Sequence, residues 1–374
     1  MKLRQFLFQL HLYTGLLAGL LLSVTGVTGS LLVFSHEIDS LLYPTLFHAR
    51  TPIKPASLDS PQSVLDLVTR VRPGVTIQSL VPPRDAGDTY ELRLKGDRRL
   101  YVDPYTGQIL GERRALAHPL GFVFSLHTKL LSGENGETAV GVGGVLLLLL
   151  GATGVVLWWP SKKGVRAGFT IRWGANWKRV NFDVHRVSGA TMALLLCLVA
   201  LTGAAMVWSE QVTGWAYQVA GIPAPRKPGS TVRKGASPLS LDELQAQAEA
   251  ALPGGVFTRI TLASKPAAPV MFRKKLPQEL HPNGTSFVYL DQYTGKVLQV
   301  ENALHARAPT RLLNLRYPLH IGQFGGWPMR VLYMLVGLTP LTLFTTGCLM
   351  WWNRVWVPKR RRSRPLEVSP GEIV

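Results

Sequence analysis

The chain has 374 residues, of which 47% are hydrophobic, a mean hydropathy of +0.15 and a formal net charge of +19. It is too apolar for an ordinary soluble protein and too polar to lie entirely in lipid, so we expect membrane helices together with water-exposed domains. Its two cysteines, Cys197 and Cys348, fall in apolar runs, which excludes both a disulfide framework and a C-x-x-C-H attachment motif.

Four apolar segments are each long enough to cross about 30 Å of hydrocarbon, which takes roughly 20 helical residues. They run from Phe6 to Phe34, Thr138 to Trp159, Ser188 to Trp208 and Trp327 to Trp352. The first segment has basic residues ahead of it, as a signal peptide does. It is too long for an h-region and lacks a small-residue cleavage site, so we expect it to be retained as an anchor.

Basic residues gather at one set of helix ends. They occur before the first helix (Lys2 and Arg4), between the second and third helices, and in the tail from Lys359. The positive-inside rule therefore predicts cytoplasmic termini, with two long stretches on the periplasmic side of a bacterial inner membrane. Part of the net charge then serves to orient the protein in the membrane, with the tail near anionic lipid. The charge does not indicate a nucleic-acid partner.

The expected fold is an α+β integral membrane protein, with four transmembrane helices in a bundle and two periplasmic lobes. Its expected parts are transmembrane helix 1 (6–36), lobe 1 (37–117), an outer amphipathic helix with transmembrane helix 2 (118–160), a cytoplasmic basic loop (161–184), transmembrane helix 3 (185–209), lobe 2 (210–310), an outer segment with transmembrane helix 4 (311–353) and a cytoplasmic basic tail (354–374).

Each lobe is predicted to be one helix followed by a small antiparallel sheet. A helical pattern starts at Ser63 in lobe 1 and at Leu241 in lobe 2, and short alternating segments follow each of them. The matching stretches LYVDPYTGQIL, from Leu100, and VYLDQYTGKVL, from Val288, contain Y-T-G, which predicts a hairpin turn.

The two halves of the chain repeat one another. HLYTG at His11 recurs as HRVSG at His185, a shift of 185 − 11 = 174 residues, and Thr28-Gly29 falls on Thr202-Gly203 at the same shift. Leu-His at His127 recurs at His320, a shift of 193 residues, and TGVVLWW falls on TGCLMWW at that shift too. An internal duplication with pseudo-twofold symmetry about the membrane normal follows.

The paired LH…TGxxxWW blocks and D-x-Y-T-G turns resemble the PepSY-associated transmembrane family, in which two PepSY domains are interleaved with four membrane helices. The resemblance covers almost the whole chain. Within the family the chain is most similar to inner-membrane reductases of ferric siderophores such as ferrioxamine, which carry two b-type haems. The resemblance therefore implies that the protein binds two haem b cofactors non-covalently.

The repeat places four histidines in two pairs. His11 and His185 fall at the cytoplasmic ends of their helices, while His127 and His320 fall on the outer side, shortly before theirs. A lone histidine at a membrane interface is more often a headgroup contact or a helix cap. Equivalent histidines that face each other across a pseudo-twofold axis instead provide two imidazoles for one haem iron, so we expect all four to be axial ligands.

Other residues near these pairs have weaker signals. Gly15 and Gly189 lie four residues after His11 and His185, where a glycine gives a haem room to approach or helps two helices to pack. His36 is a second-choice ligand or a group on the substrate side. Of the remaining histidines, two are expected in surface loops (His48 and His281) and two in structural roles (His118 and His305).

The leading functional hypothesis is a haem-dependent ferric-siderophore reductase, with a hydroxamate-type siderophore as its partner. The chain lacks a Walker loop, a G-x-G-x-x-G fingerprint and H-E-x-x-H, so electrons are expected from an unknown cytoplasmic or quinol donor. A second hypothesis is a sensing or peptidase-regulating membrane protein. A third is a transporter of a metal or its chelate. Only the first requires haem.

Overall fold

The computed structural model describes residues 3–49, 60–114, 116–159, 164–226, 228–232 and 235–356. Four helices of this part are long and apolar enough to cross a membrane: α1 (Leu3–Leu32), α6 (Gly133–Trp158), α8 (Trp177–Val207) and α13 (Gly326–Val355). They confirm a multi-pass membrane protein with four spans. The basic tail from Lys359 lies outside the described residues, as does Lys2.

The third span differs from its expected boundary. We placed the basic loop at 161–184, whereas α8 already begins at Trp177. Its start is fixed by Asn176, whose side chain accepts a hydrogen bond from the backbone N–H of Arg179 at 3.1 Å. A polar N-cap of this kind starts a helix before its apolar stretch begins, which hydropathy alone does not detect.

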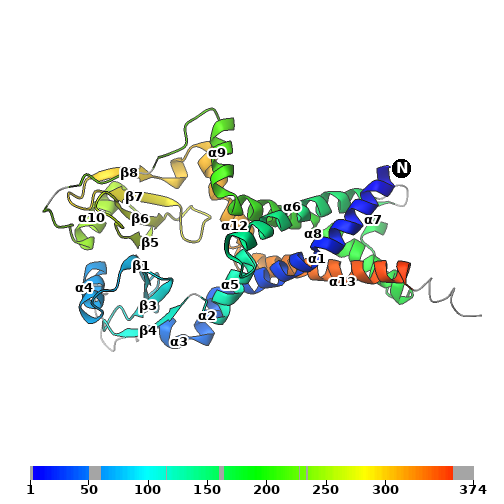
Figure 1. Ribbon diagram of the computed structural model, residues 1–374, viewed down its shortest axis with the longest axis horizontal. Helices are drawn as coiled ribbons and strands as arrows, with labels where there is room; N and C mark the ends of the chain where they lie inside the picture. Colours follow the sequence, from blue (N-terminus) through cyan, green and yellow to red (C-terminus); the bar gives the residue numbers. More distant parts are fainter. Residues whose placement is uncertain are drawn as a thin grey trace, which may run out of the picture.

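The four long helices form a bundle in which each packs against two neighbours (Figure 1). The neighbouring pairs are α1 with α13, α13 with α8, α8 with α6, and α6 with α1, so α1 and α8 lie on a diagonal. Small residues allow close packing. Gly26 of α1 lies against the backbone of Gly337 in α13, and Gly144 of α6 lies against the carbonyl of Ala200 in α8.

The water-exposed part contains one antiparallel sheet of eight strands, in the order β4-β3-β2-β1-β5-β6-β7-β8. Lobe 1 supplies β1 (Ile77–Val81), β2 (Tyr90–Leu94), β3 (Arg98–Val102) and β4 (Ile109–Arg114); lobe 2 supplies β5 (Val256–Thr261), β6 (Val270–Lys275), β7 (Ser286–Leu290) and β8 (Val297–Glu301). We expected two separate small sheets. They join because β1 pairs with β5, with Ser79 opposite Thr261 and Leu80 opposite Ile260.

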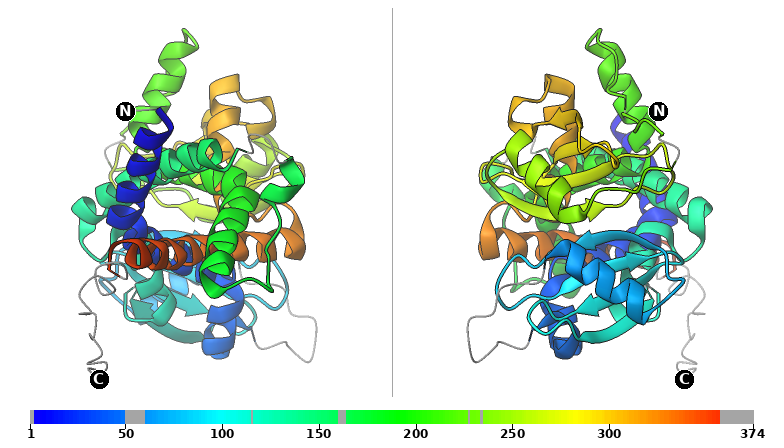
Figure 2. Two further views of the ribbon diagram at one scale, coloured as in Figure 1. Left: turned by 90° about the vertical axis from the view of Figure 1, so that its right-hand side faces the viewer. Right: turned by 90° about the vertical axis from the view of Figure 1, so that its left-hand side faces the viewer.

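Two helices cover one face of this sheet, α4 (Pro61–Val71) and α10 (Leu241–Ala251). Ser60 and Ser240 cap them, and the core between helices and sheet runs unbroken from one lobe to the other. The two helices lie at the end of the molecule farthest from the bundle (Figures 1 and 2). The other face of the sheet is therefore turned toward the bundle. This bundle-side face is partly covered, because Phe47 of α3 (Pro44–Phe47) packs on Tyr101 of β3.

The predicted Y-T-G turns are confirmed in both lobes. Asp103 Oδ1 accepts hydrogen bonds from the backbone N–H groups of Tyr105 and Thr106, at 2.9 and 3.1 Å, and Asp291 repeats this arrangement between β7 and β8. The glycine that ends each turn, Gly107 or Gly295, has a φ of +68°, a conformation that glycine adopts without strain.

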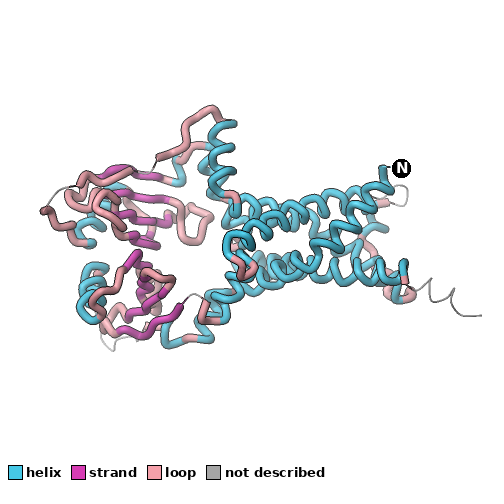
Figure 3. The backbone as a smooth tube through the Cα atoms, in the orientation of Figure 1, coloured by secondary structure: helices cyan, strands magenta, loops and turns pink. Residues whose placement is uncertain are grey.

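Short helices connect the bundle to the sheet (Figure 3). They are α2 (Ser35–Leu42), α3 (Pro44–Phe47), α5 (Pro119–Lys129), α9 (Ser209–Val219), the 3-10 helix η1 (Ala303–His305), α11 (Ala308–Asn314) and α12 (Arg316–Ile321), while α7 (Val165–Gly168) precedes α8. Helix α2 is tied to both sides, because Asp39 accepts two hydrogen bonds from Arg113 of β4 and Glu37 accepts two from Arg330 of α13.

Candidate functional site

Two histidines lie together toward the end of the bundle where α1 begins, and we name them the terminal-side pair. His11 belongs to α1 and His185 to α8, the two helices on the diagonal of the bundle. Their ring centres are 6.3 Å apart and their ring planes meet at 84°. The structure thus brings together two residues that are 174 positions apart in the sequence, as the repeat predicted.

The other two candidate histidines form the sheet-side pair, at the opposite end of the bundle. His127 is on α5 and His320 is on α12, short helices that pack against α1 and α8 respectively. Their ring centres are 6.1 Å apart and their planes meet at 53°. His127 lies on a short helix outside the second span, as its sequence pattern predicted.

A threonine hydroxyl fixes the tautomer of each ring in the terminal-side pair. Thr153 Oγ1 lies 2.9 Å from His11 Nδ1, and Thr346 Oγ1 lies 2.8 Å from His185 Nδ1. Each hydroxyl donates its one proton to the carbonyl four residues earlier in its own helix, at 2.7 Å. It must therefore accept from Nδ1–H, which leaves the lone pair of each histidine on Nε2.

Backbone carbonyls do the same for the sheet-side pair. His127 Nδ1 is 2.9 Å from the carbonyl oxygen of Thr25, and His320 Nδ1 is 3.0 Å from that of Val199. A carbonyl only accepts, so both Nδ1 atoms carry a proton and both Nε2 atoms carry a lone pair. Within the described residues no hydrogen bond occupies any of these four Nε2 atoms.

A Thr-Gly dipeptide of another helix contacts each of the four imidazole rings, and we call it the seat of that ring. In each, the threonine hydroxyl contacts Nδ1 at 2.8 to 3.2 Å and the glycine leaves room beside Cε1. The seats are Thr153-Gly154 for His11, Thr346-Gly347 for His185, Thr28-Gly29 for His127 and Thr202-Gly203 for His320. All four dipeptides are markers of the sequence repeat, but the repeat alone does not indicate this role.

The spacing of the pairs fits a metal held between two imidazoles. A metal about 2 Å from each Nε2, with each ring centre roughly 1 Å farther back, would put the ring centres about 6 Å apart. The described residues contain no group of three or more His, Cys, Asp or Glu that could hold a metal. Two imidazoles without a third protein donor suit a metal whose other ligands come from its own macrocycle, as in haem.

The family model of the PepSY-associated TM region matches residues 8–354. The match spans all four long helices, the sheet and the two histidine pairs. The chain belongs to this family. No curated protein matches it.

In this PepSY-associated protein the terminal-side pair has small neighbours beyond its seats. A methyl group on Gly15 would meet only the side chain of Leu150, at 3.7 Å, and one on Gly189 would meet that of Leu343, at 3.4 Å. These are ordinary van der Waals contacts with flexible side chains. Neither glycine is required by close backbone packing, in contrast to Gly26 in the same bundle.

Burial favours the neutral form of the sheet-side pair in the PepSY-associated protein. Burial lowers the pKa of His127, and burial together with the nearby His127 lowers the pKa of His320 to about 4. A neutral imidazole is the form that binds a metal, because the protonated ring has no lone pair to donate.

The remaining histidines are dispersed among other contacts. His36, the second-choice ligand, has its ring centre 6.1 Å from that of Phe47 rather than beside another histidine. His118 has a structural position, since it caps α5 by accepting from the backbone N–H of Gly121 at 3.1 Å. His48 accepts or donates a hydrogen bond with Ser40 at 2.8 Å.

His281 corrects an expectation, because we placed it in a surface loop. It is half-buried, and its ring stacks on that of Tyr317 with centres 4.8 Å apart. Tyr317 lies one helical turn before His320 in α12. The loop that carries His281 thus reaches the helix that carries one member of the sheet-side pair. A histidine in a Pro- and Gly-rich stretch gave no periodic signal of such a contact.

Proposed function

We propose that this protein is a di-haem b-type electron-transfer protein of the bacterial inner membrane that reduces ferric siderophores in the periplasm and releases Fe(II). The observation that carries the proposal is the two pairs of neighbouring imidazoles, with ring centres 6.3 and 6.1 Å apart, each with Nδ1 anchored and with no hydrogen bond to Nε2 among the described residues. His11 and His185 would hold one haem and His127 and His320 the other. Bound haem would supply one-electron redox chemistry at two depths of the membrane.

The positions of the pairs suit transfer across a membrane. On α1, His11 and Gly29, which seats His127, are 29 − 11 = 18 residues apart, and His185 and Gly203 on α8 have the same spacing. Eighteen helical residues span about 27 Å, close to the roughly 30 Å thickness of the hydrocarbon core. One pair therefore belongs near each surface of the bilayer.

Charge supports the orientation. Basic residues near the terminal end of the bundle include Arg4, Arg166, Arg172, Lys178 and Arg354. By the positive-inside rule this end faces the cytoplasm, which puts the sheet and the sheet-side pair in the periplasm. The sheet-side pair is then the one that electrons reach last, on the side where a ferric chelate arrives.

The end of the bundle that carries the terminal-side pair favours a lipid-soluble quinol as the electron donor. An apolar groove of about 490 Å³ lies there, lined by Trp173, Ala175, Trp177, Val180, Asn181, Val184 and Thr346. Thr346 is the residue that anchors His185. A quinol that docks in this groove gives up two electrons and two protons, so each quinol reduces two ferric chelates to two ferrous ions and two free chelators.

Reduction is sufficient for release. Siderophores bind iron through hard oxygen donors, which hold Fe(III) much more tightly than Fe(II). The protein therefore needs no bond to the chelate. It needs a surface on the same side of the bundle as the sheet-side pair, and the bundle-side face of the sheet is a candidate.

The test uses purified protein in liposomes with the sheet exposed, reduced chemically and then mixed with ferrioxamine and a ferrous-specific chelator. We expect a Soret band with split α/β bands, reoxidation by ferrioxamine and trapped Fe(II). The His320→Ala variant should lose reoxidation while its other haem stays reducible, and His305→Ala, which removes an exposed histidine, should behave like the wild type. Absence of a Soret band would reject the proposal in favour of a sensing or transport role.

A further inference from the structure

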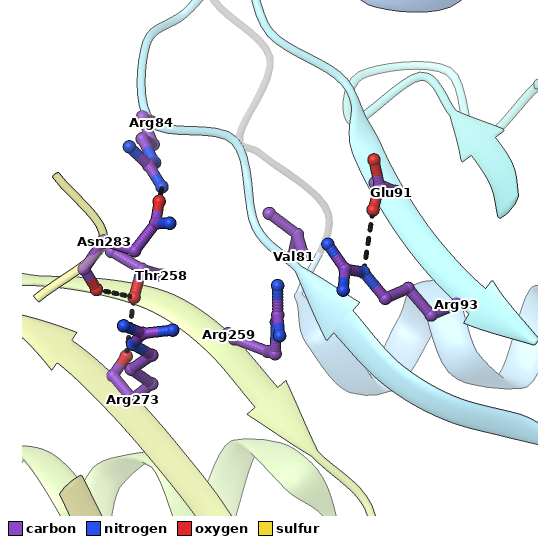
Figure 4. A pocket seen from close by; sticks show the side chains of 8 residues that line it. All are labelled: Val81, Arg84, Glu91, Arg93, Thr258, Arg259, Arg273 and Asn283. Atoms are coloured by element: carbon purple, nitrogen blue, oxygen red, sulfur yellow. Dashed lines mark hydrogen bonds and ion pairs between the residues drawn. The ribbon is translucent and has the colours of Figure 1, made fainter. Parts of the chain in front are cut away.

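A second site lies where the two lobes meet, on the bundle-side face of the sheet. It is a cavity of about 170 Å³ lined by Val81, Arg84, Glu91, Arg93, Thr258, Arg259, Arg273 and Asn283. Figure 4 shows side chains from both lobes converging on it. The cavity exists only because β1 pairs with β5, so neither lobe would form it alone.

The cavity carries unbalanced positive charge. Four of its eight lining residues are arginines and one, Glu91, is a carboxylate. Arg259 lies at the centre of the group, and its buried Nε has no hydrogen-bond partner among the described residues (Figure 4). Burial and the neighbouring Arg93 and Arg273 lower the pKa of Arg259 to about 10. A buried guanidinium N–H without an acceptor is costly, and a bound anion would supply that acceptor.

The other arginines are held in fixed positions around Arg259. Arg93 donates to Glu91 at 3.0 Å, and Arg273 donates to the carbonyl of Gly284 at 2.9 Å. Arg84 crosses between the lobes to the carbonyl of Pro282, at 3.2 Å. Guanidinium groups that are already ordered lose little entropy when they bind an oxyanion, and their planar N–H donors match carboxylate and phosphate oxygens.

Size limits what the cavity can hold. Pockets for drug-sized ligands usually measure about 300 to 1,000 Å³, so about 170 Å³ is too small for a whole ferric siderophore. It is large enough for a compact anion or for one acidic arm of a larger molecule.

The cavity is also connected to the sheet-side pair. Arg273 lies 3.4 Å from the ring of His281, and His281 stacks on Tyr317, one turn before His320 in α12. A ligand in the cavity would therefore sit on the face of the sheet that is turned toward the bundle, and its contacts would reach α12.

We propose that the cavity at the β1–β5 seam binds a compact, multiply charged oxyanion of the carboxylate or phosphate class. This part rests on the proposed reductase function: for a ferric chelate that carries an acidic arm, such as ferric citrate, that arm is the ligand of the cavity, whereas ferrioxamine, which has none, does not use it. A lipid phosphate or a free small acid offers the same chemistry.

Isothermal titration of the purified full-length protein tests the site directly. The probes are citrate, ferric citrate, inorganic phosphate, vesicles containing phosphatidic acid, and ferrioxamine, which has no acidic arm. We expect saturable binding of citrate or phosphate that weakens with added salt. Arg259→Gln should weaken it about tenfold or more, because the lost bonds are charge-assisted, and Arg93→Gln should weaken it too. Vesicle binding without binding of either free anion would instead make lipid the source.

The matched control is Arg98→Gln, which removes an arginine of the same sheet that pairs with Glu112 at 3.1 Å and does not line the cavity. It should bind citrate like the wild type. Equal binding by wild type, Arg259→Gln and Arg93→Gln, or no binding of any anionic probe, would overturn the site. Binding measured this way does not depend on electron transfer, so citrate binding without reduction of ferric citrate would support the site and count against the reductase function alone.

Discussion

His127 and His320 stand with their ring centres 6.1 Å apart although neither lies on a membrane-spanning helix. Each is carried by a short helix and held by a carbonyl of a long one, Thr25 for the first and Val199 for the second. The sheet-side pair is therefore assembled by tertiary packing at the end of the bundle that is turned toward the sheet. The terminal-side pair is built into the spans themselves.

The threonine anchors are predicted to support haem binding at both pairs. Thr153→Val removes the hydroxyl that accepts from His11 Nδ1, and we expect haem affinity at that pair to fall about 10- to 100-fold. Thr28→Val should weaken haem binding at the sheet-side pair, because it removes the hydroxyl 3.2 Å from His127 Nδ1. Haem retention during dilution measures both. Thr342→Val, whose hydroxyl bonds only within α13, is the control, and equal loss in all three variants would refute this role of the anchors.

The seat glycines predict a graded series. An added methyl group would lie 2.9 Å from His320 Cε1 in Gly203→Ala, 3.2 Å from His11 Cε1 in Gly154→Ala and 3.6 Å from His185 Cε1 in Gly347→Ala. Haem occupancy at the affected pair should fall most in the first variant and least in the last. Gly214→Ala places its methyl group in open space and should change nothing. A series in the reverse order would mean that the rings are not seated against these glycines.

His281 predicts a pH dependence of stability. Burial and the nearby Arg273, Lys275 and Arg84 lower its pKa to about 4. The unfolded chain then binds a proton more readily than the folded one, so the contribution of His281 is complete above pH of about 6.5 and is lost as pH falls toward about 4. His281→Gln should flatten the fall in melting temperature over that window, whereas His305→Gln should not. An unchanged slope in His281→Gln would contradict the buried position.

The spans were predictable because a stretch of about 20 apolar residues has few alternatives. The pairing of histidines was predictable for another reason. A duplicated helix pair places His11 and His185 in equivalent positions, and symmetry then makes them neighbours. The pairing of β1 with β5, which connects the lobes, was not predictable, because the sequence of an edge strand does not specify which other edge strand it pairs with.

The contacts of the threonines with the imidazoles could not be predicted from the sequence. Thr28 and Thr153 were visible as repeat markers, but a threonine in a membrane helix usually bonds to its own backbone, and both do so here. Their second bond, to an imidazole on another element, depends on helix packing. The environment of Arg259 could not be predicted from the sequence either, since its buried Nε is left without a partner only after the two lobes have joined.

Loss of the ion pair that attaches lobe 1 to α2 is predicted to lower the stability of the protein strongly. Arg113 and Asp39 form two hydrogen bonds, at 2.8 and 3.0 Å, and both side chains are largely buried. Arg113→Met should destabilise the protein by about 3 kcal/mol, because it leaves a buried carboxylate unpaired. Adding Asp39→Leu should recover part of that loss. Arg72→Met breaks an exposed ion pair with Glu112 and should cost under about 1 kcal/mol in the same denaturation assay.

The haem content of four single variants tests the assignment of the axial ligands. Wild-type protein should carry two haems, each variant should lose one, and the lost haem should be the same one for His11→Ala and His185→Ala and the other one for His127→Ala and His320→Ala. Reduced-minus-oxidised spectra with redox titration distinguish the two. Wild-type protein without haem, or loss of one common haem from His11→Ala and His127→Ala, would contradict the account.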